Sequence, residues 1–157
     1  MASTRLVLDH RTAPAVTPAY RSGTLLRAAD IGPAFYRFLA ESSGRPGIWR
    51  EREGLEDEDL AGVLSASLVT VLYLGGVPAG WFELVPQRYD AIRVAFAGVL
   101  PAFSGRGLER PLMAAALDAA WDEEPALVWA EVCEHDPPAM LLTLQWAGFA
   151  VPEPEEG

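Results

Sequence analysis

The chain has 157 residues, a formal net charge of −10 and a sequence pI of about 4.6. Half of the residues are hydrophobic, which argues against disorder of the whole chain and predicts one domain with an ordinary core. Nucleic acid and anionic membranes are poor partners for so acidic a protein. A basic or amine-bearing partner fits the charge, although an acidic surface also serves plain solubility.

Cysteine usage and hydropathy bear on location. Cys133 is the only cysteine, so no internal disulfide forms and a reducing compartment suits the chain. The first twelve residues lack the pattern of a signal peptide, and no stretch approaches the ~18 apolar residues of a membrane span. His10 is remote from Cys133 and His135, so no metal site of known spacing is present. We expect a cytoplasmic protein without a metal ion.

The first third of the chain predicts short strands and two helices. Residues 4–9 and 23–28 have the pattern of strands, and residues 10–22, with two prolines, that of an extended arm. Apolar residues at helical spacing predict a helix over 33–42 with Asp30 as its N-cap, and a second helix over 56–66. Residues 42–47, SSGRPG, break the first helix.

The remainder alternates between strands and helices. Two apolar runs around Gly75-Gly76 predict a β-hairpin, and residues 89–100 hold a further strand. The segments that follow are a helix over 110–121, a strand over 127–133, a helix to about 147 with Asp136 as N-cap and Gly148 as C-cap, and a short stub over 149–151. This order predicts a single α/β (α+β-like) domain with a mixed sheet over residues 23–152. An N-terminal strand and arm (1–22) precede it, and an acidic tail (153–157) follows it.

The connection FSGRGLE, residues 103–109, joins a predicted strand to a predicted helix. Its glycines allow peptide N–H groups to turn toward a ligand, and the helix start adds a positive dipole end. Together these features suit a pyrophosphate, and Arg106 could add charge. A tight turn explains two glycines about as well.

The same loop, taken with its neighbours, resembles the GNAT superfamily of acyl-CoA-dependent N-acetyltransferases. That family has the motif R/Q-x-x-G-x-G/A between a central strand and a helix, and Ser104 to Glu109 occupy it here after VLPAF (99–103). The stretches LYLGGVPAGWFEL (72–84), AGVLPAFSGRGL (97–108) and AGF (147–149) are similar to one bacterial branch. The resemblance covers most of residues 23–149.

The resemblance implies a GNAT fold, with a mixed, mostly antiparallel sheet flanked by helices, and acetyl-CoA as cosubstrate. The acetyl group would pass to a primary amine of a small molecule or peptide, in a cleft between the strand before the loop and the strand at 127–132. A glutamate, often acting through water, would take the amine proton, and a tyrosine on the last helix would protonate the thiolate. The backbone of Ala97, Gly98 and Val99 would hold the pantetheine arm. The amides of Ser104, Gly105, Arg106, Gly107, Leu108 and Glu109 would hold the pyrophosphate.

Two positions of the loop depart from the motif. Ser104 replaces the arginine or glutamine, and Glu109 replaces the last glycine or alanine. A carboxylate at Glu109 would repel a phosphate by about 1–4 kcal/mol at a separation of ~4 Å. Alternatively, Glu109 is a good first-turn residue that swings to solvent or pairs with Arg106 or Arg110.

Further departures lie outside the loop. Leu144 stands at the usual tyrosine position, Pro137 where a histidine is common, and Arg93 where a carboxylate is common. The family's final strands are cut short, and the N-terminal strand is a candidate to fill that gap.

Glu83, in the apolar strand GWFELV, is the first candidate for the general base, because burial would raise its pKa toward a useful range. Otherwise it points to solvent or pairs with Arg93. Glu131 is a second candidate. The resemblance makes Trp49 and Trp81 candidates to line the acceptor site, because the family places that site near them, although tryptophan is more often core.

Three functions are compatible with the sequence. The first is an N-acetyltransferase, and the second is a catalytically impaired GNAT-fold binding module that has lost CoA binding. The third is a domain that forms homodimers, with its sheet edge serving an assembly. The glycines and VLPAF favour the enzyme, whereas Glu109, Pro137 and Leu144 favour the binding module.

Overall fold

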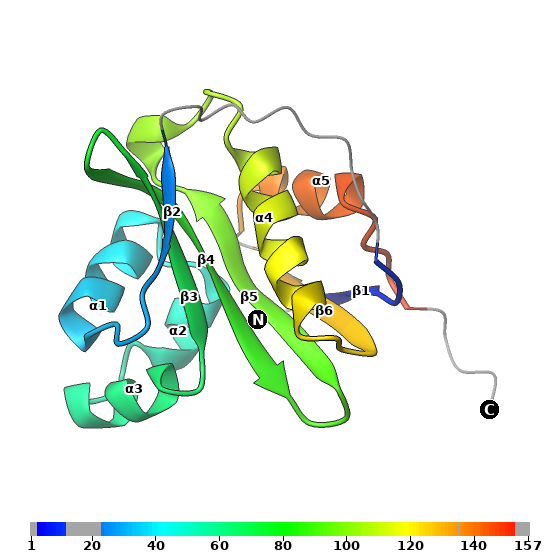
Figure 1. Cartoon of the computed structure of the whole chain (residues 1–157), viewed down its shortest axis with the longest axis horizontal. Helices are drawn as coiled ribbons and strands as arrows, with labels where there is room; N and C mark the ends of the chain where they lie inside the picture. Colours follow the sequence, from blue (N-terminus) through cyan, green and yellow to red (C-terminus); the bar gives the residue numbers. More distant parts are fainter. Residues whose placement is uncertain (1–2, 12–22, 135, 153–157) are drawn as a thin grey trace.

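The computed structural model describes residues 3–11, 23–134 and 136–152 of the chain. One six-stranded sheet carries helices on both faces (Figure 1). The elements, in chain order, are β1 (Ser3–Leu8), β2 (Thr24–Arg27), α1 (Pro33–Ser42), α2 (Gly47–Arg52), α3 (Asp57–Leu64), β3 (Leu68–Leu74), β4 (Val77–Gln87), β5 (Ala91–Val99), a 3₁₀ turn (Pro101–Phe103), α4 (Glu109–Asp122), β6 (Leu127–Cys133) and α5 (Pro138–Trp146).

The sheet has the strand order β1-β6-β5-β4-β3-β2, and every neighbouring pair is antiparallel except β5 and β6. The mixed, mostly antiparallel sheet expected from the sequence is therefore confirmed. The hairpin expected around Gly75-Gly76 is confirmed as β3 and β4, which pair along their length. The strand expected at 23–28 is β2, at one edge of the sheet.

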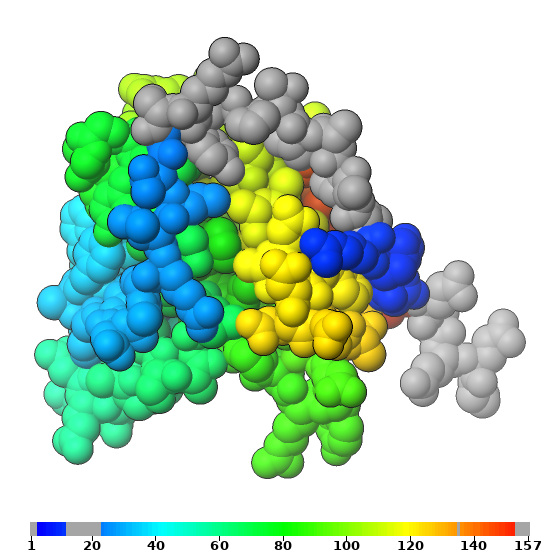
Figure 2. Space-filling model, viewed as in Figure 1, coloured from blue at the N-terminus to red at the C-terminus, as the bar shows by residue number. Residues whose placement is uncertain are grey.

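Strand β1 forms the opposite edge. It pairs with β6 along its whole length, from Ser3 opposite Cys133 to Leu8 opposite Val128. Val7 also exchanges two backbone hydrogen bonds of 2.8 and 3.0 Å with Ala150, so the stub expected after α5 is a single bridge. In Figure 2 this strand, in dark blue, packs against the yellow and orange segments. The N-terminal strand thus covers the edge of β6 and contacts the stub after α5; that it replaces the family's final strands stays a prediction.

The parallel pair β5 and β6 is short. Its ladder joins Ala91, Ile92 and Arg93 to Leu127, Val128 and Trp129 and ends there, although both strands continue. Beyond Arg93, β5 stays paired with β4, but within the described residues its edge on the β6 side has no strand partner. The separation of the two strands opens the sheet on the side of α5.

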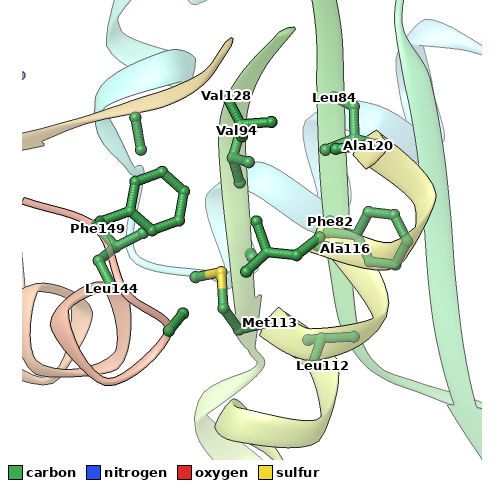
Figure 3. Close-up of a cluster of buried hydrophobic side chains, with 14 of the residues drawn as sticks. Phe82, Leu84, Val94, Leu112, Met113, Ala116, Ala120, Val128, Leu144 and Phe149 are labelled. Carbon is green, nitrogen blue, oxygen red and sulfur yellow. The ribbon is translucent and has the colours of Figure 1, made fainter. Parts of the chain in front are cut away.

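Two apolar cores lie on the two faces of the sheet. On one face, α4 and α5 cover the sheet, and Met113, Leu144 and Phe149 meet side chains of β5 and β6 (Figure 3). On the other face, Trp49 and Leu60 of α2 and α3 join the aromatic side chains of α1, β4 and β5 in a second core. Alternation along β3 and β4 supplies both cores, as expected for strands buried on two faces.

Several predicted details differ in the structure. The helix over 33–42 is confirmed, but its N-cap is Gly32 and makes no side-chain hydrogen bond, so Asp30 is not the cap. Asp136 is likewise not the cap of α5: its Oδ2 accepts a hydrogen bond of 2.8 Å from the Cys133 N–H instead. Helix α2 was not predicted, because six residues give too little helical periodicity to be detected. The arm over 12–22 and the tail 153–157 lie outside the described residues.

A pair of substitutions in β1 tests its place in the sheet. Leu6 is buried in the α4 core, whereas its neighbour Val7 points to the other face and is only partly buried. We expect Leu6→Ala to lower the free energy of unfolding by about 2–5 kcal/mol and Val7→Ala by about 1 kcal/mol, measured by urea denaturation. Equal losses in the two variants would mean that β1 does not pack in this register.

Candidate functional site

A cavity of about 260 Å³ fills the opening between β5 and β6. Its walls come from six elements that are far apart in the sequence, including the short helix α2. Residues that line it include Gly47, Ile48, Arg50 and Glu51 of α2, Arg93 to Ala97 of β5, Met113 of α4, Ala130, Glu131 and Cys133 of β6, and Asp136, Met140 and Leu144. The end near Glu131 is polar, whereas the end near Met113 and Leu144 is apolar.

A second cavity, of about 240 Å³, adjoins the first and lies between the end of β5 and α5. The two cavities share the wall residues Pro46, Phe96, Ala97, Asp136 and Met140. A third hollow, between the start of α4 and α5, shares Glu109, Ala139 and Thr143 with the second. The three spaces therefore adjoin one another from the sheet opening to the glycine loop.

The backbone of Ala97, Gly98 and Val99 lines the second cavity. These residues lie on β5 beyond the end of its pairing with β6, so one edge of their backbone faces the cavity rather than a strand. Gly98 also has no room for a side chain, because an added Cβ would come within 2.8 Å of the Phe96 ring. The three residues stand where the resemblance expects a pantetheine arm.

The loop before α4 presents unused amides. Gly105 and Gly107 have φ angles of 77° and 73°, which other residues rarely adopt, and an added Cβ on either would meet open space. In the described part of the chain, the N–H groups of residues 105–110 donate to no backbone carbonyl, and α4 has no side-chain cap. Free amides at a helix start form an anion cradle.

Glu109 is the first residue of α4 and lines the second and third spaces. The structure includes neither of the ion pairs considered for it: Arg106 lies over the Phe103 ring at 4.9 Å, and Arg110 over the Trp146 ring at 5.1 Å. Within the described residues its carboxylate makes no hydrogen bond or ion pair. The negative charge therefore remains next to the amides that would bind an anion.

Glu83 is fully buried and lines none of the cavities described above. Its Oε1 accepts a hydrogen bond of 2.7 Å from the Tyr36 hydroxyl, and its Oε2 accepts one of 2.6 Å from Arg52 Nη1. The same Arg52 nitrogen lies 2.8 Å from the Tyr36 oxygen. Glu83 therefore pairs with Arg52, not with Arg93 as considered from the sequence.

Two members of this buried cluster, Tyr36 and Arg52, have shifted pKa values. Burial, and then the charge of Glu83, raises the pKa of the Tyr36 hydroxyl well above its usual value, so Tyr36 remains a donor. For Arg52, burial opposes the charge, but the Glu83 carboxylate outweighs it and raises the pKa. This cluster connects α1, α2 and β4, so it holds the cavity wall in place.

Glu131 lines the first cavity, and about a quarter of its side chain (27%) is exposed. Its carboxylate lies between two arginines: Arg5 Nη2 is 3.8 Å from Oε1, and Arg93 Nη2 is 3.7 Å from Oε2. Both guanidinium groups also contact the Trp129 ring, with centroid distances of 4.0 and 5.2 Å. Of the two predicted glutamates, only Glu131 is within reach of a molecule in the cavity.

Arg93 and Cys133 are two further polar residues of the first cavity. Arg93 Nη2 lies 3.2 Å from Glu51 Oε2, so Arg93 contacts two carboxylates. Burial, and then the charge of Asp136, raises the pKa of the Cys133 thiol, so the thiol is neutral near pH 7. Leu144, at the expected tyrosine position, is a buried wall residue. Among the described residues, no tyrosine or histidine lines the three spaces.

The two tryptophans expected at an acceptor site lie in the second core instead. Trp81 is fully buried, stacks on Phe96 at 4.2 Å, and donates a hydrogen bond of 2.8 Å to Ser43 Oγ. Trp49 is 2% exposed and meets the Tyr36 ring edge-on. Neither lines a cavity described above, so both tryptophans serve to pack the second core, next to the cavity-lining residues Ile48 and Phe96.

The described residues contain no group of three or more potential ligands arranged to hold a metal ion. His10 pairs with its neighbour Asp9 at the surface, and His135 is outside the described residues. No helix in the described part of the chain is long and apolar enough to cross a membrane.

The sheet is antiparallel except for one parallel pair, whose strands separate, and a glycine loop leads from the sheet into helix α4. This arrangement defines the acetyltransferase fold class that the sequence resembles. Residues 33–149 match the sequence model described as the acetyltransferase (GNAT) family. Since this match covers more than half of the chain, the protein belongs to the GNAT family of acetyltransferases. No curated protein sequence matches the chain significantly.

Solved structures share the fold. A tandem GNAT protein from the clavulanic acid biosynthesis pathway has a TM-score of 0.65 at 20% identity, covering 94% of this chain and 49% of its own. A GNAT-family acetyltransferase from Streptococcus pneumoniae TIGR4 has a TM-score of 0.58 at 19% identity, and the match covers 82% of this chain and 87% of that protein. A GCN5-related N-acetyltransferase from Sphaerobacter thermophilus has a TM-score of 0.66 at 16% identity, and the match covers 96% of this chain and 48% of that protein. The chain thus spans about half the length of the first and third.

Sequence reasoning missed three residues of this region. Arg52 lies in the helix that was not predicted, and no local pattern marks an arginine for burial. Arg5 reaches Glu131 only because β1 pairs with β6. Asp136 was identified as a helix cap, and an aspartate before a proline gives no other signal.

Breaking the buried ion pair tests the positioning cluster. Arg52→Met leaves the Glu83 carboxylate buried without its cation, so we expect a loss of about 3–5 kcal/mol in the free energy of unfolding, measured by urea denaturation. The matched control is Arg45→Met, which breaks the exposed pair with Glu53 and should cost less than about 1 kcal/mol. A similar small loss at Arg52 would contradict the buried arrangement.

Proposed function

We propose that the protein transfers an acetyl group from acetyl-CoA to the primary amine of a small molecule or peptide, in the cytoplasm. The single observation that carries this proposal is the set of adjoining spaces that lead from the opening between β5 and β6 to the free amides before α4. This form suits a long donor with an anionic end and a reactive end. Family membership supports the same chemistry.

The residues present fit such a donor along most of its length. The amides of residues 105–110 would hold a pyrophosphate, and the backbone of 97–99 would hold the pantetheine arm, as the resemblance implies. When bound, acetyl-CoA supplies a thioester whose carbonyl accepts the amine. The apolar walls at Met113 and Leu144 exclude water from that end of the first cavity.

Glu131 is the general base in this proposal. It faces the cavity, whereas both Glu83 oxygens accept hydrogen bonds inside the protein. Glu131 takes the amine proton directly or through a water, the nitrogen bonds to the acetyl carbon, and the carbon–sulfur bond breaks. Solvent returns a proton to the sulfur, because Leu144 has no hydroxyl to give.

Substitution of each glutamate distinguishes the two candidate bases. Glu131→Gln should lower kcat/KM about 100-fold for an acetylated amine, with a smaller loss at higher pH, where more of the amine arrives without its proton. Glu83→Gln, assayed where it is folded, should keep turnover within about fivefold, because it leaves Arg52 without its counter-ion and so lowers stability but removes no group that faces the cavity. The reverse ranking would restore Glu83 as the base.

One observation favours a second function, a GNAT-fold binding module that has lost CoA binding. The unpaired Glu109 carboxylate lines the spaces beside the loop amides, where it would repel a phosphate. In the enzyme, the Glu109 side chain must rotate away from the loop amides when acetyl-CoA binds. In the binding module, it stays beside the amides and prevents acetyl-CoA from binding.

Calorimetric titration of acetyl-CoA separates these two functions. For the enzyme, the wild type binds with micromolar affinity, and Glu109→Gln, which removes only the charge, tightens binding about tenfold. Glu109→Gly, which also removes the side chain, should match Glu109→Gln. Wild-type protein that shows no binding up to millimolar concentration, next to a Glu109→Gly variant that binds, would establish the binding module.

A further inference from the structure

A groove next to the first cavity has a charge opposite to that of the chain as a whole. Its walls include Arg5 of β1, Arg88 and Tyr89 of the turn between β4 and β5, and Trp129 of β6. Among the described residues that line it there is no carboxylate, and Asp90, next in the turn, is not part of the wall. In a chain with a net charge of −10, a groove with two arginines is suited to an anion.

The guanidinium of Arg5 is held in place but not used as a donor. It lies over the Trp129 ring at 4.0 Å, and its nearest carboxylate oxygen, on Glu131, is 3.8 Å away, too far for a hydrogen bond. In the described part of the chain, Arg5 donates no hydrogen bond, and Arg88 has neither a hydrogen bond nor an ion pair. Just over half of the Arg5 side chain (56%) is exposed. A planar guanidinium held on a ring is a preorganised site for a carboxylate.

Glu131 lines the first cavity and contacts Arg5, which lines this groove. Trp129 and Glu131 are two residues apart on β6, so they lie on the same face of the sheet. Arg5 is directly opposite Glu131 in the β1–β6 register and reaches its Oε1. The Glu131 carboxylate in the cavity can bind a cation, and the Arg5 guanidinium in the groove can bind an anion. The two groups are close enough for one small molecule to contact both.

We propose that the acceptor is a free α-amino acid, whose amine meets Glu131 in the cavity and whose carboxylate is bound by Arg5. The proposal rests on the acetyl transfer proposed above and specifies its substrate. Arg88 adds positive charge to the same groove and strengthens the attraction. The short distance between Glu131 and Arg5 matches the adjacent amine and carboxylate of an α-amino acid, whereas a diamine has no anionic group for Arg5 to bind.

Matched pairs of acceptors test this proposal. Phenylalanine with phenethylamine, and ornithine with putrescine, differ only in the α-carboxylate. With saturating acetyl-CoA, the wild type should have a kcat/KM about tenfold or more higher for each amino acid than for its decarboxylated amine. Arg5→Met, which removes the guanidinium but keeps an unbranched side chain, should lower kcat/KM for the amino acids about tenfold, through KM, and lower it less for the amines.

Two further variants control for folding and for general charge. Arg88→Met lies in an exposed turn away from the β1–β6 pairing and should give a smaller loss of the same kind. Arg27→Met removes an exposed arginine from β2, at the opposite edge of the sheet, and should leave the preference unchanged. Equal use of both members of each pair by the wild type, or an equal loss for both in Arg5→Met, would overturn the proposal.

Calorimetric titration of phenylalanine separates this proposal from the proposed function. If nothing is acetylated but the wild type binds phenylalanine and Arg5→Met binds it about tenfold more weakly, acetyl transfer fails and the amino-acid site stands. If the amines are acetylated but phenylalanine neither binds nor reacts better than phenethylamine, the amino-acid site fails and acetyl transfer stands.

Discussion

The separation of β5 from β6 after Arg93 and Trp129 is the constraint on which the rest of the site depends. Parallel strands that stayed paired would bury the backbone of residues 97–99 in a ladder and leave no room between them. Because the ladder stops after three pairs, the edge of β5 is open, and Met113 and Leu144 line the space. The same opening leads along β5 to the glycine loop.

Two long-range interactions hold the elements on either side of this opening in place. The buried Tyr36–Glu83–Arg52 cluster ties α2 to α1 and β4. A six-residue helix is too short to be stable alone, so this cluster keeps Glu51 at the cavity. On the other side, β1 pairs with β6 and brings Arg5 to Glu131. Glu83 therefore acts on the site through packing, whereas Glu131 faces it.

The charges near the site are arranged unlike those of the chain as a whole. Arginines surround Glu131 at the sheet opening, although acidic residues outnumber basic ones in the sequence. At the other end, Glu109 lies beside amides that suit an anion. In the reaction proposed above, the first arrangement would suit a zwitterionic acceptor, and the second would weaken the binding of an anionic donor. The balance between donor binding and donor exclusion therefore depends on one flexible side chain.

The sequence by itself determined the elements with strong local signals: the hairpin around Gly75-Gly76, helix α1, the glycine loop before α4, and through them the resemblance to the family. These features depend on periodicity and turn chemistry, which act over a few residues. It did not determine helix α2, which is too short to give a pattern.

Only the tertiary structure decided which glutamate faces the cavity. Glu83 and Glu131 both lie in apolar strands. Glu83 is paired inside the protein with the buried Arg52, which is distant in sequence, whereas Glu131 lines the cavity. The role of β1 was likewise decided by long-range pairing, because strand register depends on partners that local sequence does not encode.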